Sequence, residues 1–189
     1  MQGTALIAGT IVQVSKRRQI RHKDDGKGSG TEQVTFTAEQ DFAILICESC
    51  ELRDSTMGSV LMVLQDGQIV YDVRDGNNYG DQGIAFNGQY AHDVPLAVLG
   101  MSDSWKMHCD FLFGAEDQMP HPTLEAITGV GNTPAYRGSL VAVFKNFDVT
   151  KAGDRIPNFQ FVVASAATST ASDHVLDNVT TTSSPAYQL

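Results

Sequence analysis

The sequence contains few cysteines and no apolar run long enough to cross a membrane. Three cysteines in 189 residues are an odd number, which disfavours a disulfide framework and favours reduced thiols in a protein made in a cytoplasm. The longest apolar runs, such as residues 42–47 and 140–144, are far shorter than the ~20 apolar residues that a spanning helix needs. We therefore expect no membrane-spanning segment.

The sequence also lacks the common signatures of enzymes. It has no Gly-x-Ser-x-Gly elbow, no His-Glu-x-x-His helix and no phosphate loop ending in Gly-Lys-Ser or Gly-Lys-Thr, and its 5 histidines are scattered. We therefore predict that the chain is not an enzyme and that it has no catalytic, cofactor-binding or metal-binding residues.

Positive charge is scarce outside one segment. The net charge is −9, and residues 16–27 hold six of the 13 basic residues. The chain after Lys27 therefore has 7 basic (13 − 6) and 20 acidic (22 − 2) residues, a net charge of −13. Because like charges repel, we expect most of the protein to repel nucleic acid, except at that segment.

The composition is that of a folded domain followed by a polar tail. Hydrophobic residues make up 42% of the chain and charged residues 19%, which is ordinary for a protein with one sizeable core or two small ones. After Val163 the sequence becomes rich in Ala, Ser and Thr. We predict a β domain over residues 1–163 and a tail or linker over residues 164–189.

One short helix followed by two strands is predicted in the last third of the domain. Pro120 and Pro122 prevent a helix from extending upstream, so it begins at Pro122 or Thr123 and reaches Thr128, before Gly129. Residues 139–144 and 155–163 are β-branched and aromatic runs, and Pro157 lies near the start of the second.

The remaining apolar segments favour strands. Asp66 and Gly67 separate two apolar runs and predict a hairpin with a type I′ turn. Residues 42–47 are continuously apolar, and periodicity leaves both strand and helix open. The whole pattern predicts a mainly β fold, a β-barrel or β-sandwich with one short helix. Its other expected strands are residues 6–14, 34–38, 60–64, 68–71, 91–100 and 104–113.

The basic segment, residues 16–30, is polar and ends in alternating glycines. Such a segment buries little apolar surface, so we predict a mobile loop or linker. Two alternatives stay open: a nucleic-acid or phosphate site, because clustered cations neutralise phosphates, and a subunit contact with an acidic neighbour.

Two groups of residues have the right chemistry for a site but a simpler explanation as well. Cys47, Cys50, His108 and Cys109 are four possible zinc ligands, but adjacent residues of a strand point to opposite faces, which favours buried thiols. Glu116 and Asp117, with Glu125 or Asp110, could be the acid and base of a glycosidase. Carboxylates also favour the N-terminal end of a helix.

Two blocks of residues carry a resemblance. The first contains Glu116-Asp117-Gln118, Pro120, Pro122, Glu125-Ala126, Gly129 and residues 132–138, and the second is residues 154–159. In this order and at similar spacing they resemble the phage tail hub and tail-tip attachment family, which includes hub proteins of gene-transfer agents. The sequence departs from that pattern at His121, which is usually acidic in the family, and at Asp154, which is often Asn. Weaker similarity includes Cys47-Glu48 and residues 64–72, so the resemblance covers most of residues 9–163.

This resemblance implies a structural part of a phage tail hub or tail tip. Such proteins form a trimeric ring that joins the tail tube to tip or fibre proteins and leaves a passage for DNA, without specific DNA binding. The alternative is a module that binds host-surface glycan through the loop at residues 76–88. The resemblance and the turn chemistry single out residues for a structural or subunit-contact role: Pro120, Pro122, Glu125, Pro134, Tyr136, Arg137, Gly138, Arg155 and Pro157. Arg137 and Arg155 either pin the helix-turn-strand unit or bridge to a neighbouring subunit.

Overall fold

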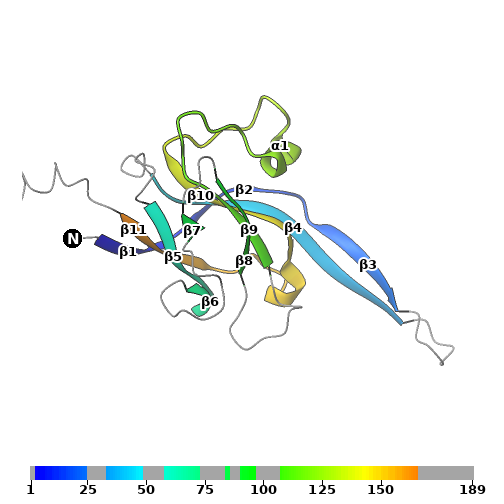
Figure 1. Cartoon of the computed structure of the whole chain (residues 1–189). Coiled ribbons are helices and arrows are strands. Elements are labelled where there is room, and N and C mark those ends of the chain that lie inside the picture. The colour runs from blue at the N-terminus through cyan, green and yellow to red at the C-terminus, as the bar shows by residue number, and fades with distance from the viewer. Residues whose placement is uncertain are drawn as a thin grey trace, which may run out of the picture.

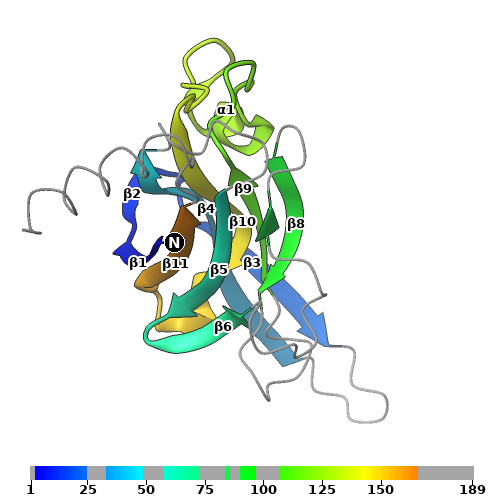
Figure 2. The same cartoon turned by 60° about the vertical axis from the view of Figure 1, so that its left-hand side comes forward.

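The computed structural model describes residues 3–24, 33–48, 58–72, 84–85, 90–96 and 107–165. These residues form two antiparallel sheets that face each other, with one short α-helix outside them (Figures 1 and 2). The prediction of a mainly β fold, a barrel or a sandwich with one short helix, is confirmed, and of the two forms the described sheets are sandwich-like. Within the described ranges, no helix has the length and apolarity needed to cross a membrane.

The first sheet has the order β1-β11-β5-β6, and β7 also pairs with β5. Its strands are β1 (Gly3–Ala8), β11 (Phe159–Ser165), β5 (Gly58–Gln65), β6 (Gln68–Asp72) and β7 (Ile84–Ala85). In the pairing of β1 with β11, Gly3 lies opposite Ser165. The predicted hairpin is present as β5 and β6. Its turn residues Asp66 and Gly67 have φ angles of 49° and 81°, as a type I′ turn requires.

The second sheet has the order β2-β4-β10-β9-β8, and β3 also pairs with β4. Its strands are β2 (Thr10–Val14), β3 (Arg18–Asp24), β4 (Gln33–Glu48), β8 (Tyr90–Leu96), β9 (Met107–Leu112) and β10 (Ser139–Asp148). The helix α1 (Pro122–Thr128) follows β9, and the 3₁₀ helix η2 (Val149–Ala152) follows β10.

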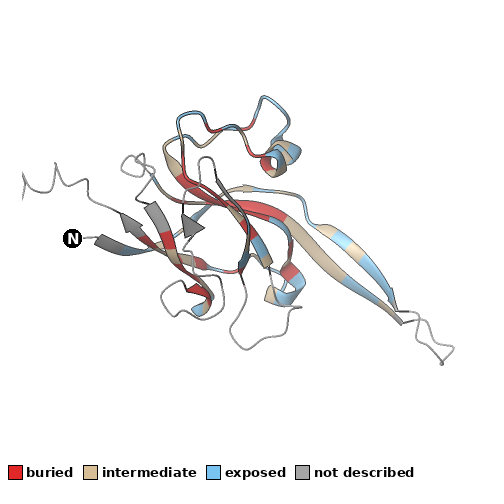
Figure 3. Ribbon diagram, viewed as in Figure 1, coloured by how far each residue is buried: buried red, intermediate tan, exposed pale blue. Residues whose placement is uncertain are grey.

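Phenylalanine rings join the two sheets. Phe42 of β4 stacks on Phe144 of β10 with ring centroids 4.7 Å apart, and Phe144 lies 4.6 Å from Phe159 of the opposite sheet. All three side chains are buried (Figure 3). Aromatic pairs at such separations add ~1 kcal/mol each beyond the burial of their area. This ring contact is the centre of the core.

A second apolar cluster lies on the outer face of the second sheet, under α1. Leu124 of the helix is fully buried against Ala43, Leu112, Val141 and Val143. Because β10 is covered on both faces, its residues 140–144 are all buried. This two-sided cover explains the continuous apolar run that the sequence shows there.

Pairing with neighbouring strands sets the type and length of the segments that the sequence left ambiguous or predicted too short. Residues 42–47 are strand, and together with residues 34–38 they belong to the single 16-residue strand β4. β10 continues to Asp148 through a bulge at Asn146, which has a φ of 52°. The predicted strand over residues 155–163 begins later, at Phe159, because residues 155–158 bind the β5–β6 turn instead, as described below.

The prediction of one strand over residues 6–14 is wrong in detail. The chain forms β1 and β2, which belong to different sheets, and Gly9 is the residue between them. A Cβ atom at position 9 would lie 2.1 Å from Ile44 Cγ2 and 3.2 Å from a ring carbon of Phe161. The chain changes sheets where only glycine fits.

The prediction of a mobile loop over residues 16–30 is wrong for residues 18–24. They form β3, which pairs residue by residue with β4 from Arg18 opposite Glu39 to Asp24 opposite Gln33. β3 buries little of its own surface, but the length of β4 supplies partners for its backbone. Residues 25–30 of this prediction lie outside the described residues, as do the 76–88 loop except Ile84–Ala85 and the tail from residue 166.

The close approach at Gly9 predicts a large loss of stability for Gly9→Ala. The added methyl group overlaps Ile44 Cγ2, and overpacking of this kind costs ~1–3 kcal/mol. Urea unfolding measures the loss. In an Ile44→Ala background, which removes the overlapped atom, the same change should cost at least ~1 kcal/mol less. Equal costs in both backgrounds would contradict this packing.

Candidate functional site

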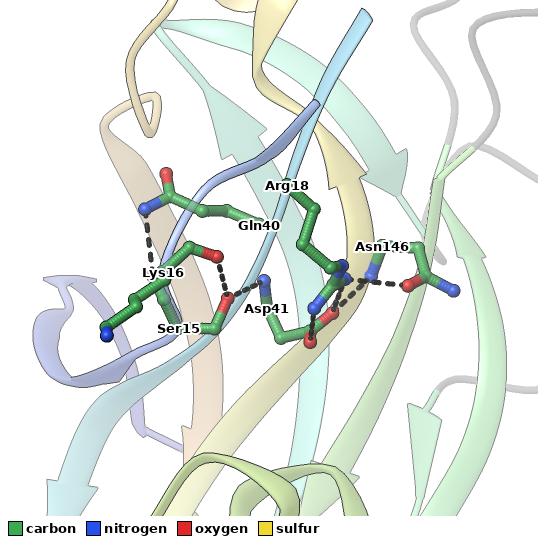
Figure 4. Close-up of polar contacts among 6 residues, drawn as sticks. All are labelled: Ser15, Lys16, Arg18, Gln40, Asp41 and Asn146. Atoms are coloured by element: carbon green, nitrogen blue, oxygen red, sulfur yellow. Dashed lines mark hydrogen bonds and ion pairs between the residues drawn. The ribbon is translucent and has the colours of Figure 1, made fainter. Parts of the chain in front are cut away.

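An ion pair and a bulge hold the base of the β3–β4 hairpin. Arg18 donates two hydrogen bonds to the carboxylate of Asp41, at 2.6 and 2.8 Å, and a third at 2.8 Å to Oδ1 of Asn146 (Figure 4). The backbone N–H of Asn146 also donates to Asp41 Oδ1 at 2.7 Å. Three strands, β3, β4 and β10, therefore meet at the carboxylate of Asp41. We call this group of contacts among Arg18, Asp41 and Asn146 the Asp41 node.

The electrostatics of this node favour the charged carboxylate. The Arg18 hydrogen bond, together with the Asn146 N–H, lowers the pKa of Asp41 although burial opposes the shift. The same pair raises the pKa of Arg18. Only 10% of the Asp41 side chain is exposed, so water screens this pair less than an ordinary surface salt bridge.

Ser15 ties the chain segment between β2 and β3 to the same point. The backbone N–H of Ser15 donates to the carbonyl of Asp41 at 2.8 Å, and Ser15 Oγ accepts from the backbone N–H of Asp41 at 2.9 Å. Gln40 donates its side-chain N–H to the Ser15 carbonyl at 3.1 Å (Figure 4). The position at which β3 leaves the body is thus fixed from two sides.

Residues 113–138, here called the connector, are organised around a buried glutamine. Gln118 is 2% exposed; its Oε1 accepts from the N–H of Gly114 at 2.9 Å and its Nε2 donates to the carbonyl of Ala135. Arg137 Nε donates to the Gln118 carbonyl at 3.0 Å, and the N–H of Gly138 donates to the carbonyl of Gly114 at 2.8 Å. These bonds close the connector into a loop on the sheet.

His121 links the start of α1 to β9. Its Nε2 lies 2.8 Å from Asp110 Oδ2, and its Nδ1 accepts from the N–H of Thr123 at 3.3 Å as the N-cap of the helix. The tautomer with a proton on Nε2 satisfies both contacts. His121 therefore caps the start of α1, a position that Ser, Thr, Asp and Asn occupy more often.

The second block of family-like residues holds the β5–β6 turn. Arg155 donates to both oxygens of Asp66, at 3.1 and 2.9 Å, and the N–H of Asn158 donates to Asp66 Oδ1 at 3.0 Å. The N–H of Asp66 returns a bond to the Asn158 carbonyl at 2.8 Å. Burial by itself would raise the pKa of Asp66, but the bonds from Arg155 and Asn158 lower it below its ordinary value.

The nine residues singled out from the sequence lie in two places. Seven belong to the connector or its end: Pro120, Pro122, Glu125, Pro134, Tyr136, Arg137 and Gly138. Pro122 is the first residue of α1, and Tyr136 and Gly138 have φ angles of 52° and 72°. Arg155 and the buried Pro157 belong to the segment that binds Asp66. Both arginines thus make bonds within the chain.

The possible zinc ligands and the acidic group are not brought together into a site among the described residues. His108 is exposed while Cys109 is buried, because neighbouring residues of β9 face opposite sides, and burial raises the pKa of the Cys109 thiol. Cys50 lies outside the described residues. In the ranges that the structure describes, no three His, Cys, Asp or Glu side chains are grouped as metal ligands. Asp110 is engaged by His121.

A cleft of about 760 Å³ lies beside the hairpin base and is lined by charged, polar and apolar residues. Within it His108 Nδ1 lies 2.9 Å from Asp93 Oδ1, and His22 Nε2 lies 2.8 Å from Thr37 Oγ1. Both contacts are exposed, so neither has the desolvation that activates a nucleophile or base. The polar and charged residues that line the cleft include His22, Thr37, Glu39, Asp93, His108, Asp110, Lys145, Asp148 and Lys151.

Sequence reasoning did not single out Asp41 or Asn146, and it named Asp66 only as a turn residue and Asn158 only within the second block, without their contacts. Each carries a small polar side chain next to an apolar strand, which is a usable but weak signal. Asn146 offered the best one, because Asn is among the residues that tolerate the positive φ of a bulge. The partners across the chain are set by tertiary pairing and could not be read from the sequence.

Comparisons with known proteins give a distant likeness. No protein-family model and no curated protein matches this sequence. Among solved structures, the chain is similar to a chain of the structure titled "Virion of native gene transfer agent (GTA) particle", with a TM-score of 0.36 and 20% sequence identity. The match covers 88% of this chain and 27% of the other, so this chain spans about a quarter of that protein.

The node at Asp41 predicts that Asp41→Asn destabilises the protein. The neutral amide loses its charge-assisted bonds to Arg18, and we expect a loss of about 2 kcal/mol at pH 7. The carboxylate's contribution is complete above the ordinary Asp pKa of ~3.9 and falls as pH drops through the lowered folded value. The difference between wild type and variant should therefore shrink below about pH 4.

Urea unfolding between pH 7 and pH 3 measures this effect. Asp117→Asn is the matched control because Asp117 is exposed, and its cost should lie within ~0.5 kcal/mol. A constant difference between wild type and Asp41→Asn at every pH would show that the Asp41 charge contributes nothing.

Proposed function

We propose that this chain is a structural component of a phage or phage-like tail hub, located at the tail tip of the virion. The observation that carries the proposal is the role of the residues that resemble the tail-hub family. Gln118, Arg137 and Gly138 close the connector by bonds within the chain, and the second block clasps the β5–β6 turn. Residues used in this way favour an architectural role.

The fold suits such a role. Two antiparallel sheets leave strand edges, and assemblies cover such edges with neighbouring chains. In the proposed assembly, copies of the chain form a trimeric ring that joins the tail tube to tip or fibre proteins. The chain after Lys27 has a net charge of −13. An acidic lining would let DNA pass through the ring without specific binding, because like charges repel.

The glycan-binding alternative stays a prediction. Its loop, residues 76–88, lies outside the described residues except for Ile84–Ala85. Binding on a glycan array that is lost when this loop is shortened would favour that function over the structural one.

Immunogold electron microscopy tests the location. Antibodies raised against the purified chain should label one end of the tail, at the tip distal to the head, and antibody pre-absorbed with the chain is the control. Label on the head, label along the tube, or protein found only free of particles would contradict the proposal.

We also propose that the chain has no hydrolase activity. The acidic residues have a structural explanation. Glu125 lies in the first turn of α1, and Glu116 and Asp117 lie in the connector before it. Carboxylates near the N-terminal end of a helix are stabilised by its dipole. Purified chain incubated with peptidoglycan should release no soluble fragments above the buffer control. Turnover by the wild-type chain that Glu125→Gln abolishes would overturn this proposal.

A further inference from the structure

The β3–β4 hairpin extends away from the rest of the protein. We call residues 18–24 and 33–38 the arm. In two views it leaves the body on a different side from α1 (Figures 1 and 2), and its residues 18–23 and 34–38 are exposed or half-buried (Figure 3). In the described part of the sheet, β3 pairs with β4 alone, and residues 33–38 of β4 pair with β3 alone. A two-stranded ribbon on its own is marginally stable in water, so a contact beyond the root would stabilise the arm.

One face of the arm combines an aromatic ring with positive charge. Phe36 lies opposite Arg21, and Val34 lies opposite Lys23. Directly opposite residues of an antiparallel pair share a face of the sheet. Phe36 is 53% exposed, and Arg21 and Lys23 are exposed. The face is therefore apolar at its centre and cationic along one strand.

The connector carries the complementary surface. Met119 is 69% exposed and Val130 83% exposed, which are the largest exposed fractions among the described large hydrophobic residues. Glu116 and Asp117, close to Met119 in the chain, are exposed acidic residues. Apolar groups bordered by negative charge match an apolar ring bordered by positive charge. The arm and the connector lie on different sides of the molecule (Figures 1 and 2), so one chain cannot bring its own two surfaces together.

We propose that the arm of one copy docks on the connector of a second copy. The contact is head to tail, which leaves an arm and a connector free at the two ends of any pair and allows a ring to close. The arm's root is already fixed by the Asp41 node and by Ser15, so little conformational freedom of the root is lost on binding. This inference rests on the proposed assembly and names the surfaces that build it.

Nucleic acid is the other partner that a cationic arm could attract. The rest of the chain disfavours it, because the residues after Lys27 have a net charge of −13 and would repel phosphates that approached the arm. On a second copy, the negative charge of the connector is the surface that binds the arm. The same chain therefore supplies both the cationic and the acidic side of the contact.

Charge reversal tests the contact. The arm variant carries Arg21→Glu and Lys23→Glu, and the connector variant carries Glu116→Lys and Asp117→Lys. Light scattering over a range of concentrations should show self-association of the wild-type chain, weakened at least ~10-fold in either variant because like charges then face each other. The chain with all four changes should regain association, since the charges are again opposite.

A matched control and a cross-link sharpen the result. Lys16→Glu reverses an exposed charge that lies outside the arm and should leave association unchanged. A carbodiimide should join Lys23 to Glu116 or Asp117 between ¹⁴N- and ¹⁵N-labelled chains, as mass spectrometry identifies. Circular dichroism verifies that each variant is folded.

Three results would overturn the docking. They are a wild-type chain that stays monomeric up to ~1 mM, an arm variant that associates as well as wild type, and a four-residue variant that regains nothing. Loss of binding to a mixed-sequence single-stranded oligonucleotide in the arm variant, with its mass in solution unchanged, would assign the arm to nucleic acid instead. Immunogold labelling away from the tail tip would refute the proposed function while leaving the docking result intact.

Discussion

The structure depends on the length of one strand. β4 has 16 residues and pairs with β2, β3 and β10. Its C-terminal part supplies Phe42, Ile44 and Ile46 to the core between the sheets, and Ala43 to the cluster under α1. Its N-terminal part leaves the core and carries the arm. One strand thus connects the packed interior to the arm.

Asp41 lies where β4 passes from one environment to the other. Residues 42–44 are buried, whereas residues 34–40 are half-buried or exposed. Apolar packing cannot hold a strand that has left the core, so directional bonds replace it at this point. The carboxylate binds Arg18 of β3 and the N–H of Asn146 in β10. Its hydrogen bonds set the orientation of the arm, while the phenylalanine contacts set the separation of the sheets.

The sequence predicted the elements whose cause is local. Prolines and glycines mark the ends of α1, and Asp66-Gly67 marks the hairpin, because each fixes or permits particular backbone angles. The same reasoning failed where the cause is distant. Residues 18–24 look like a loop by composition and become a strand through pairing with β4, and Gly9 gives no local sign that the chain changes sheets there. At the candidate site the sequence singled out Arg137 and Arg155 but not the groups that they bind. Arg155 and Asp66, for example, are 89 residues apart in the chain.

The pairing of β1 with β11 brings the two ends of the described β structure together. Gly3 lies opposite Ser165 on neighbouring antiparallel strands. The chain therefore enters and leaves the described β structure at adjacent positions near the edge of one sheet. A unit with this geometry can be spliced into a host protein as an insert without separating the flanking halves. The same geometry suits a short covalent bridge between residues 3 and 165.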